Sequence, residues 1–169
     1  MISNFYKDLE AARGAETLVF ELLVGAAADT YTFEWVGDNP AYYNLGDIRA
    51  INKATGKESF IEVKDDSRIA DTGNVLCENG VDYGYSYAIG NIYNHFDCYA
   101  IRSAKENKVY LINGEILRAN FKKGRRVYIE HPQQATDAFL LPLAEIKRLG
   151  GLIGTISYDL ERRQASIAA

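Results

Sequence analysis

The sequence predicts a single α/β domain over residues 1–169, with a mixed central sheet flanked by helices. A chain of 169 residues is long enough to bury one core and too short for two independent ones. Hydrophobic residues make up 47% of the chain and charged residues 25%, a globular composition that excludes a disordered protein. Helical and strand patterns do not alternate regularly, so we expect a mixed sheet rather than a doubly wound parallel one.

Residues 3–24 form the first predicted element, an amphipathic helix with Ser3 or Asn4 as its N-cap. Its apolar stripe recurs at helical spacing and consists of Phe5, Leu9, Ala12, Val19 and Leu23. Glu16 falls inside this stripe, where a carboxylate is costly unless it is paired or binds a cation. A salt bridge to a basic residue and a place in a metal site explain Glu16 equally well.

Three strands are predicted next. Residues 30–36 alternate aromatic and polar side chains, which is typical of a half-buried strand. Residues 47–52 and 57–64 follow as two further strands, and residues 53–56 between them form a four-residue hairpin loop that ends on Gly56.

The rest of the chain is predicted to begin with a long functional loop from Asp65 to about Gly84, with room for short structure of its own, because this stretch is polar and rich in Gly and Asp. The later elements are a helix over 86–95, strands over 96–103 and 108–112, a helix over 114–123, strands over 126–130 and 138–141, and a helix over 143–149.

The cellular address expected from the sequence is the cytoplasm, with no membrane partner. No apolar run approaches the roughly 20 residues that a membrane-spanning helix needs, and the first residues lack the pattern of a secretion signal. Cys77 and Cys98 make neither a disulfide framework nor a zinc site, so we expect both in the core.

The net charge of −4 is unevenly divided. Residues 1–100 hold 16 acidic and 7 basic residues, whereas residues 101–169 hold 7 acidic and 12 basic ones. This asymmetry is compatible with a basic surface beside an acidic, metal-binding half, and equally with ordinary solvated faces.

The predicted hairpin places two acids face to face. If its loop closes symmetrically, Asp47 lies opposite Glu62, and such a pair has Cβ atoms about 4.5–5.5 Å apart. Mg²⁺ held by one or two carboxylates, waters and substrate phosphate oxygens would relieve their repulsion. Lys64 shares a strand face with Glu62 and adds a positive charge beside a metal-bound water. The alternative is a surface hairpin with solvated side chains.

These residues also resemble the motifs of a known family. Gly46-Asp47-Ile48 precedes Ile61-Glu62-Val63-Lys64, and an upstream helix carries Gly14-Ala15-Glu16. This combination resembles the PD-(D/E)XK nuclease superfamily, with Gly46 where the name-giving proline would stand. The continuation resembles small phage and bacterial members, on Lys64-Asp65-Asp66, Thr72-Gly73-Asn74 with Glu78, and Phe96-Asp97-Cys98-Tyr99-Ala100-Ile101. The resemblance covers roughly residues 5–115.

The resemblance implies a restriction-endonuclease-like fold and a metal site. Asp47, Glu62, Glu16 and the carbonyl of Val63 would hold Mg²⁺ or Mn²⁺, and Lys64 would be the catalytic lysine. The implied activity is that of a metal-dependent endodeoxyribonuclease acting on DNA, and homodimers are frequent among enzymes that cut duplexes. The alternatives are a catalytically silent relative that binds nucleic acid or a protein partner, and a structural or assembly module.

Other residues have two interpretations each. A group of polar and basic side chains would contact DNA or belong to turns and solvated helix ends: Asn74, Lys122, Lys123, Arg125 and Arg126. Four tyrosines would stack on unpaired bases or pack a core or a dimer interface: Tyr83, Tyr85, Tyr87 and Tyr93. Glu78 would be a remote ligand, a loop anchor or a solvated side chain. We expect His95 and His131 to be structural.

Overall fold

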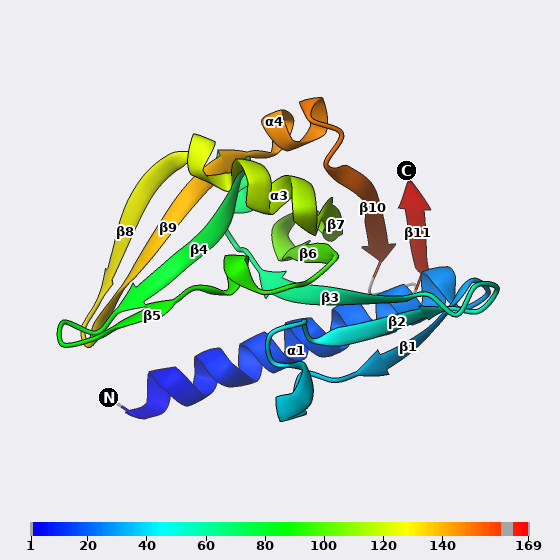
Figure 1. Ribbon diagram of the computed structural model, residues 1–169, viewed down its shortest axis with the longest axis horizontal. Coiled ribbons are helices and arrows are strands. Elements are labelled where there is room, and N and C mark those ends of the chain that lie inside the picture. The colour runs from blue at the N-terminus through cyan, green and yellow to red at the C-terminus, as the bar shows by residue number, and fades with distance from the viewer. Residues whose placement is uncertain (1, 160–163, 169) are drawn as a thin grey trace.

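The fold is α/β, and the computed structural model describes residues 2–159 and 164–168 (Figure 1). The helices are α1 (Ile2–Ala27), α2 (Ile69–Thr72), α3 (Gly114–Asn120) and α4 (Leu143–Arg148), with short 3₁₀ turns η1 (Pro40–Tyr42), η2 (Asn91–Tyr93), η3 (Ala104–Glu106) and η4 (Phe121–Lys123). The strands are β1 (Tyr31–Trp35), β2 (Ile48–Asn52), β3 (Glu58–Asp65), β4 (Asn74–Asp82), β5 (Tyr87–Ile89), β6 (Cys98–Ser103), β7 (Lys108–Asn113), β8 (Arg125–His131), β9 (Gln134–Pro142), β10 (Leu152–Asp159) and β11 (Gln164–Ala168).

The larger sheet is mixed, as the sequence predicts. Its strand order is β1-β2-β3-β6-β7-β10-β11, and β3 and β6 form the parallel pair among antiparallel neighbours. The predicted hairpin is confirmed, since Ile51 pairs with Glu58 and the backbone N–H of Asn52 donates to the carbonyl of Lys57. Gly56 closes this loop with φ 69°, a conformation that glycine adopts without strain. The central position of β3 buries both of its faces.

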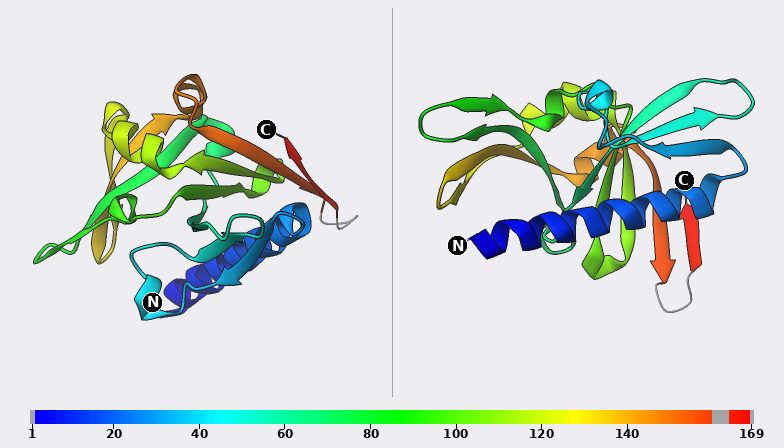
Figure 2. Two further views of the ribbon diagram at one scale, coloured as in Figure 1. Left: turned by 45° about the vertical axis from the view of Figure 1, so that its right-hand side comes forward. Right: turned by 90° about the horizontal axis from the view of Figure 1, so that it is seen from below.

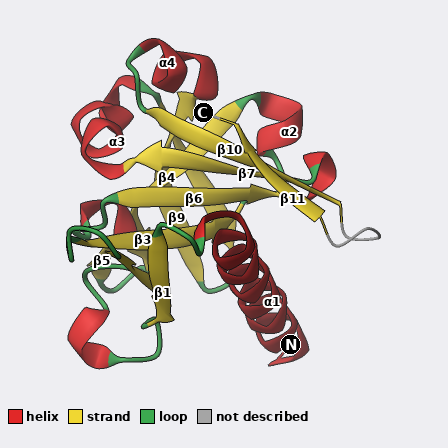
Figure 3. Ribbon diagram, turned by 90° about the vertical axis from the view of Figure 1, so that its right-hand side faces the viewer, coloured by secondary structure: helices red, strands yellow, loops and turns green. Residues whose placement is uncertain are grey.

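Helix α1 covers one face of this sheet (Figure 3). The predicted helix over 3–24 is confirmed within these longer bounds. Val19 and Leu23 are buried against Ile61 and Val63 of β3, as their helical spacing predicts. The predicted stripe residues Phe5, Leu9 and Ala12 lie outside the described side chains. Among the described residues, no helix has the length and apolarity needed to cross a membrane.

A second, four-stranded sheet corrects two predictions. Its order is β5-β4-β9-β8. The loop predicted from Asp65 to Gly84 is wrong over most of its length, because β3 continues through Asp65 and β4 occupies nine residues. The helix predicted over 86–95 is also wrong, since strand β5 and turn η2 take its place. Pairing of β4 with the distant β9 decides the first outcome and pairing of β5 with β4 the second, and local composition carries no trace of either.

The end of the chain adds strands that the prediction omits. The sequence prediction ends with the helix over 143–149, whereas β10 and β11 complete the larger sheet. Buried Gly154, Ile156 and Tyr158 alternate with Thr155 and Ser157, so β10 does carry the two-residue period of a strand.

The main core lies between the two sheets. Phe96, Tyr99 and Ile101 pack there with Val75 and Cys77 of β4. Beyond this core the four-stranded sheet continues outward as a projecting arm, formed by the ends of β4, β5, β8 and β9 (Figures 1 and 2). The arm and α1 lie on different sides of β3, which therefore stands at the junction of all the layers.

Candidate metal centre

The carboxylate of Asp47 lies where strand β2 stops. The ladder between β2 and β3 ends at Ile48 and Ile61, and the backbone N–H of Asp47 still donates to the carbonyl of Ile61 at 2.9 Å. One pleat further along β3, the N–H of Val63 donates to Oδ2 of Asp47 at 2.8 Å. N–H and C=O of a residue in a strand face the same neighbour, so the carbonyl of Val63 also points to this edge. The edge thus gathers carboxylate and carbonyl oxygens.

Gly46 allows this close approach. Its φ is 141°, which strongly favours glycine, and a Cβ atom added there would lie 2.8 Å from the carbonyl oxygen of Ile61. The backbone leading into Asp47 therefore runs against β3 with no room for a side chain.

Glu62 and Lys64 occupy the opposite face of β3 from Ile61 and Val63, as the two-residue period predicts. Glu62 is almost fully buried, and Nζ of Lys64 lies 3.0 Å from its Oε1. In the parallel ladder Glu62 pairs with Tyr99, so the carboxylate borders the core between the sheets.

Glu16 reaches the same region from α1. It is half-buried, and its pKa is raised to about 7 by burial and then by the neighbouring charge of Asp47. Lys64 lowers this pKa and Glu62 raises it further, so the structure brings Glu16 within electrostatic reach of all three hairpin residues. The four predicted side chains therefore lie within range of one another's charges.

Burial raises the pKa values of the two hairpin acids as well. For Asp47 this effect outweighs the N–H bond from Val63 and the charge of Lys64. For Glu62 burial and the charge of Asp47 outweigh the pairing with Lys64. Burial alone would lower the pKa of Lys64, but Glu62 and Asp47 raise it overall. The region therefore concentrates more negative charge than its one lysine offsets, a condition that favours a bound cation.

Two further acids belong to this electrostatic environment. The charge of Asp38 raises the pKa of both Glu16 and Asp47. Glu78 of β4 raises the pKa of Glu62 and of Lys64. No local sequence pattern links Asp38 to the centre. The sequence predicts Glu78 as a remote ligand, a loop anchor or a solvated side chain, and its effect on Glu62 and Lys64 favours the first of these roles.

A metal would need some rearrangement here. Within residues 2–159 and 164–168, no three His, Cys, Asp or Glu side chains are grouped closely enough to hold an ion. The donors nonetheless fit a hard cation in type, because carboxylate and backbone carbonyl oxygens are what Mg²⁺ and Mn²⁺ take. Glu62 is at present paired with Lys64, so its oxygen would turn from the ammonium group to the ion.

The predicted DNA contacts lie elsewhere. Asn74 begins strand β4, and its side-chain amide donates to the carbonyl of Thr72 at 3.0 Å. The basic cluster lies around η4 and the start of β8, where Nζ of Lys123 donates to Asn120 and Arg126 is paired with buried Asp137. Lys122 and Arg125 are exposed.

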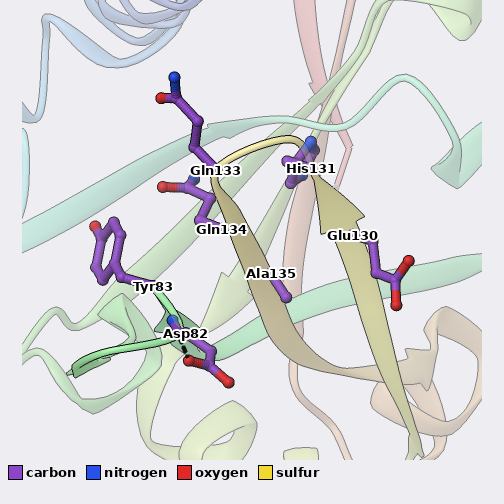
Figure 4. Close-up of a pocket in the computed structure, with 8 residues that line it drawn as sticks. Asp82, Tyr83, Glu130, His131, Gln133, Gln134 and Ala135 are labelled. Atoms are coloured by element: carbon purple, nitrogen blue, oxygen red, sulfur yellow. Dashed lines mark hydrogen bonds between the residues drawn. The ribbon is translucent and has the colours of Figure 1, made fainter.

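The remaining candidates divide by burial. Cys77 is buried and Cys98 half-buried, both as free thiols. His95 and His131 are exposed. A pocket of about 310 Å³ lies at the tip of the arm, and no candidate metal ligand lines it (Figure 4). Its walls are Asp82, Tyr83, Gly84, Glu130, His131, Gln133, Gln134 and Ala135.

Comparisons with family models, curated proteins and solved structures gave no significant match to this chain.

Proposed function

We propose that this protein is a divalent-metal-dependent nuclease that hydrolyses DNA phosphodiester bonds. The observation that carries the proposal is the convergence of Asp47, Glu62 and Glu16 with Lys64 at the end of a central strand. Burial raises the pKa of all three acids, so their ionised forms are costly in the folded protein and a bound cation would stabilise them. The resemblance of these residues to PD-(D/E)XK nucleases points to the same chemistry.

The side chains of the centre have different roles in the proposed reaction. Asp47, Glu62, Glu16 and the carbonyl of Val63 would hold Mg²⁺ or Mn²⁺. When bound, such an ion lowers the pKa of a coordinated water and offsets charge on the scissile phosphate. Lys64 lies beside Glu62, from where its ammonium group orients the attacking water and stabilises the charge of the pentavalent phosphorane. The water oxygen bonds to phosphorus and loses a proton to solvent, the bond from phosphorus to one sugar oxygen breaks, and that oxygen takes up a proton from solvent to leave as a hydroxyl.

A catalytically silent binding protein is the second candidate. The ion pair between Glu62 and Lys64 favours it, because the two side chains satisfy each other without a metal. Among the side chains that the structure describes, neither Asp47 nor Glu16 forms an ion pair with a lysine or arginine, which favours the nuclease.

A cleavage panel tests the proposal. Plasmid, linear, single-stranded and branched DNA are incubated with Mg²⁺, Mn²⁺ or EDTA, using wild type, Asp47→Asn and Asp71→Asn. Asp71 is an exposed acid, paired with Lys105 away from the centre, and serves as the matched control. We expect metal-dependent products from wild type and Asp71→Asn only. Products that persist in Asp47→Asn would refute the assigned centre, and a metal-dependent shift of DNA without cleavage would favour the silent protein.

A further inference from the structure

Exposed aromatic and aliphatic side chains gather on the arm. Among the described residues, six of the ten large exposed hydrophobic side chains lie there or beside it: Tyr83, Tyr85, Tyr87, Ile89, Tyr93 and Tyr128. Tyr85 is 89% exposed, Tyr128 57% and Tyr87 50%. We call these six side chains the tyrosine face: Tyr87 and Tyr128 lie on the side of the arm that bears Asp137, and the rings of Tyr83 and Tyr85 lie at its tip with their centroids 6.3 Å apart. Such a concentration of exposed hydrophobic side chains in one part of the surface is typical of an interaction site.

A buried carboxylate fixes the rings of this face. Asp137 of β9 is fully buried, and it accepts a hydrogen bond from the hydroxyl of Tyr87 at 2.9 Å and two from Arg126 at 2.8 Å. The guanidinium of Arg126 also lies over the ring of Tyr128, 5.3 Å from its centroid. The ring of Tyr87 lies over Gly80, where an added Cβ would come within 2.2 Å of it. The rings of Tyr87 and Tyr128 are therefore held in place before any ligand arrives, which lowers the entropy cost of binding.

Cations are interleaved with these rings. Nζ of Lys122 lies 5.7 Å from the centroid of the Tyr93 ring, and the exposed Lys123 follows it. Asp137 offsets the charge of Arg126, so the two lysines supply the net positive charge next to the face. The acids Asp82 and Glu130 lie only at the tip, in the walls of the pocket.

The tip pocket adds hydrogen-bonding groups to the end of the arm. The side chains of Gln133, Gln134 and His131 surround it (Figure 4). Amide and imidazole groups donate and accept hydrogen bonds, as the edge of an unpaired base requires, whereas the acids beside them would repel a phosphate.

The tyrosine face adjoins the candidate metal centre through an irregularity in β4. The register of β4 against β9 shifts between Glu78 and Gly80. Cys77 of β4 lies in the same core cluster as Tyr99, the ladder partner of Glu62, whereas the side chain of Asn79 contacts the tyrosines. Asn79 Nδ2 donates to Tyr87 Oη at 3.0 Å, and Tyr93 Oη donates to Asn79 Oδ1 at 2.7 Å. Residues close together on β4 thus lie beside the candidate metal centre and beside the tyrosine face.

We propose that the tyrosine face binds an unpaired stretch of nucleic acid by stacking its bases, while Lys122 and Lys123 contact its phosphates. Combined with the proposed nuclease activity, on which this step rests, the preferred substrate is single-stranded or carries a single-stranded segment. Interleaved aromatic rings and cations are characteristic of surfaces that bind single strands. The core of a homodimer interface is more apolar and poorer in charge than a face built on an Arg–Asp pair.

Binding in EDTA tests this inference without any need for cleavage. Fluorescence polarisation is measured with labelled DNA and RNA single strands of about 15 nucleotides, which span one site, and with a blunt duplex of the same length. The test variant is Tyr85→Ala combined with Tyr128→Ala. Tyr→Phe at both positions retains the rings, and Ile153→Ala removes a 50% exposed side chain from the other sheet. Thermal melting checks that every variant is folded.

We expect wild type to bind the single strand more tightly than the duplex, and the double Ala variant to lose about tenfold in affinity or more. The double Phe variant and Ile153→Ala should stay within about twofold of wild type, since stacking needs the ring alone. Single-strand affinity that is absent in wild type, or unchanged in the double Ala variant, would overturn the inference. So would a wild-type dimer that the double Ala variant dissociates in sedimentation without a change in affinity.

Failure of the two proposals can be told apart. Tyrosine-dependent binding without cleavage of any substrate would leave the tyrosine face standing and remove the nuclease. Metal-dependent cleavage with tyrosine-independent binding would do the reverse.

Discussion

Oδ2 of Asp47 accepts a 2.8 Å hydrogen bond from the backbone N–H of Val63, so a side chain occupies the place of the next backbone acceptor on strand β2. This single contact fixes the carboxylate against β3 at the point where the carbonyl of Val63 faces the same edge. The same contact has two opposite effects on the pKa of Asp47. The hydrogen bond lowers the pKa, but the position against β3 buries the carboxylate, and burial raises the pKa by more.

The stability of the protein should depend on pH through Glu16. Its pKa is about 7 in the folded state against 4.5 for the free side chain, so the folded state favours the protonated form. The associated stability is fully present below pH 4.5 and is lost as the pH rises to about 7. At pH 8, Glu16→Gln should therefore unfold at higher denaturant concentration than wild type. The expected gain in the free energy of unfolding is about 1 kcal/mol after allowance for solvent screening. The two proteins should be alike near pH 4.

Chemical denaturation in EDTA at several pH values measures this effect. Glu21→Gln is the matched control, because Glu21 is exposed on the same helix and should give no pH-dependent difference. A Glu16→Gln variant less stable than wild type at pH 8 would contradict the account.

Divalent ions should stabilise the folded protein. An ion that binds only the folded state adds about 2.7 kcal/mol at one hundred times its dissociation constant. Mg²⁺ or Mn²⁺ should thus raise the melting temperature of wild type and of Asp71→Asn, and have little effect on Glu62→Gln. Calorimetric melting against metal concentration measures the shift, and an equal rise in Glu62→Gln would place the ion elsewhere.

Gly46 should tolerate no side chain. Gly46→Ala would place Cβ 2.8 Å from the carbonyl oxygen of Ile61 at φ 141°, so we expect a loss of about 2 kcal/mol or more in the free energy of unfolding. Gly14→Ala provides a contrast of opposite sign, because Gly14 lies in α1 with nothing within 4 Å of an added Cβ. That change should stabilise the protein by about 0.5–1 kcal/mol. Similar effects at both glycines would show that the approach of Gly46 to β3 is not required.

The hairpin that carries the site could be predicted because its determinants are local. The two-residue period and a four-residue loop ending on Gly56 are enough to predict the register of β2 against β3, although Asp47, predicted to pair with Glu62, lies just beyond the last ladder pair. The helical period likewise places Glu16 on the side of α1 that carries Val19 and Leu23. These residues needed no distant contact to be assigned.

The arm could not be predicted in the same way. Strand β4 reads as a polar loop because Glu78, Asn79 and Gly80 interrupt its apolar period at the bulge, and only β9 makes it a strand. Tyr87 sits in a segment with a helix-like pattern, and the gap over Gly80 together with Asp137, fifty residues away, holds it in a strand. The proximity of Asp38 to Glu16 also arises only when α1 packs on the sheet.

The central claim is that Lys64 acts in metal-dependent hydrolysis, and the most direct measurement is the rate of DNA cleavage by Lys64→Ala beside Lys57→Ala. Lys57 is exposed at the loop end of the same hairpin and serves as the matched lysine. In Mg²⁺ and in Mn²⁺, we predict that Lys57→Ala cleaves at the wild-type rate and that Lys64→Ala loses roughly two orders of magnitude or more. The Lys64→Ala variant should still bind DNA. Equal cleavage by the two variants, or cleavage that persists in EDTA, would contradict the account.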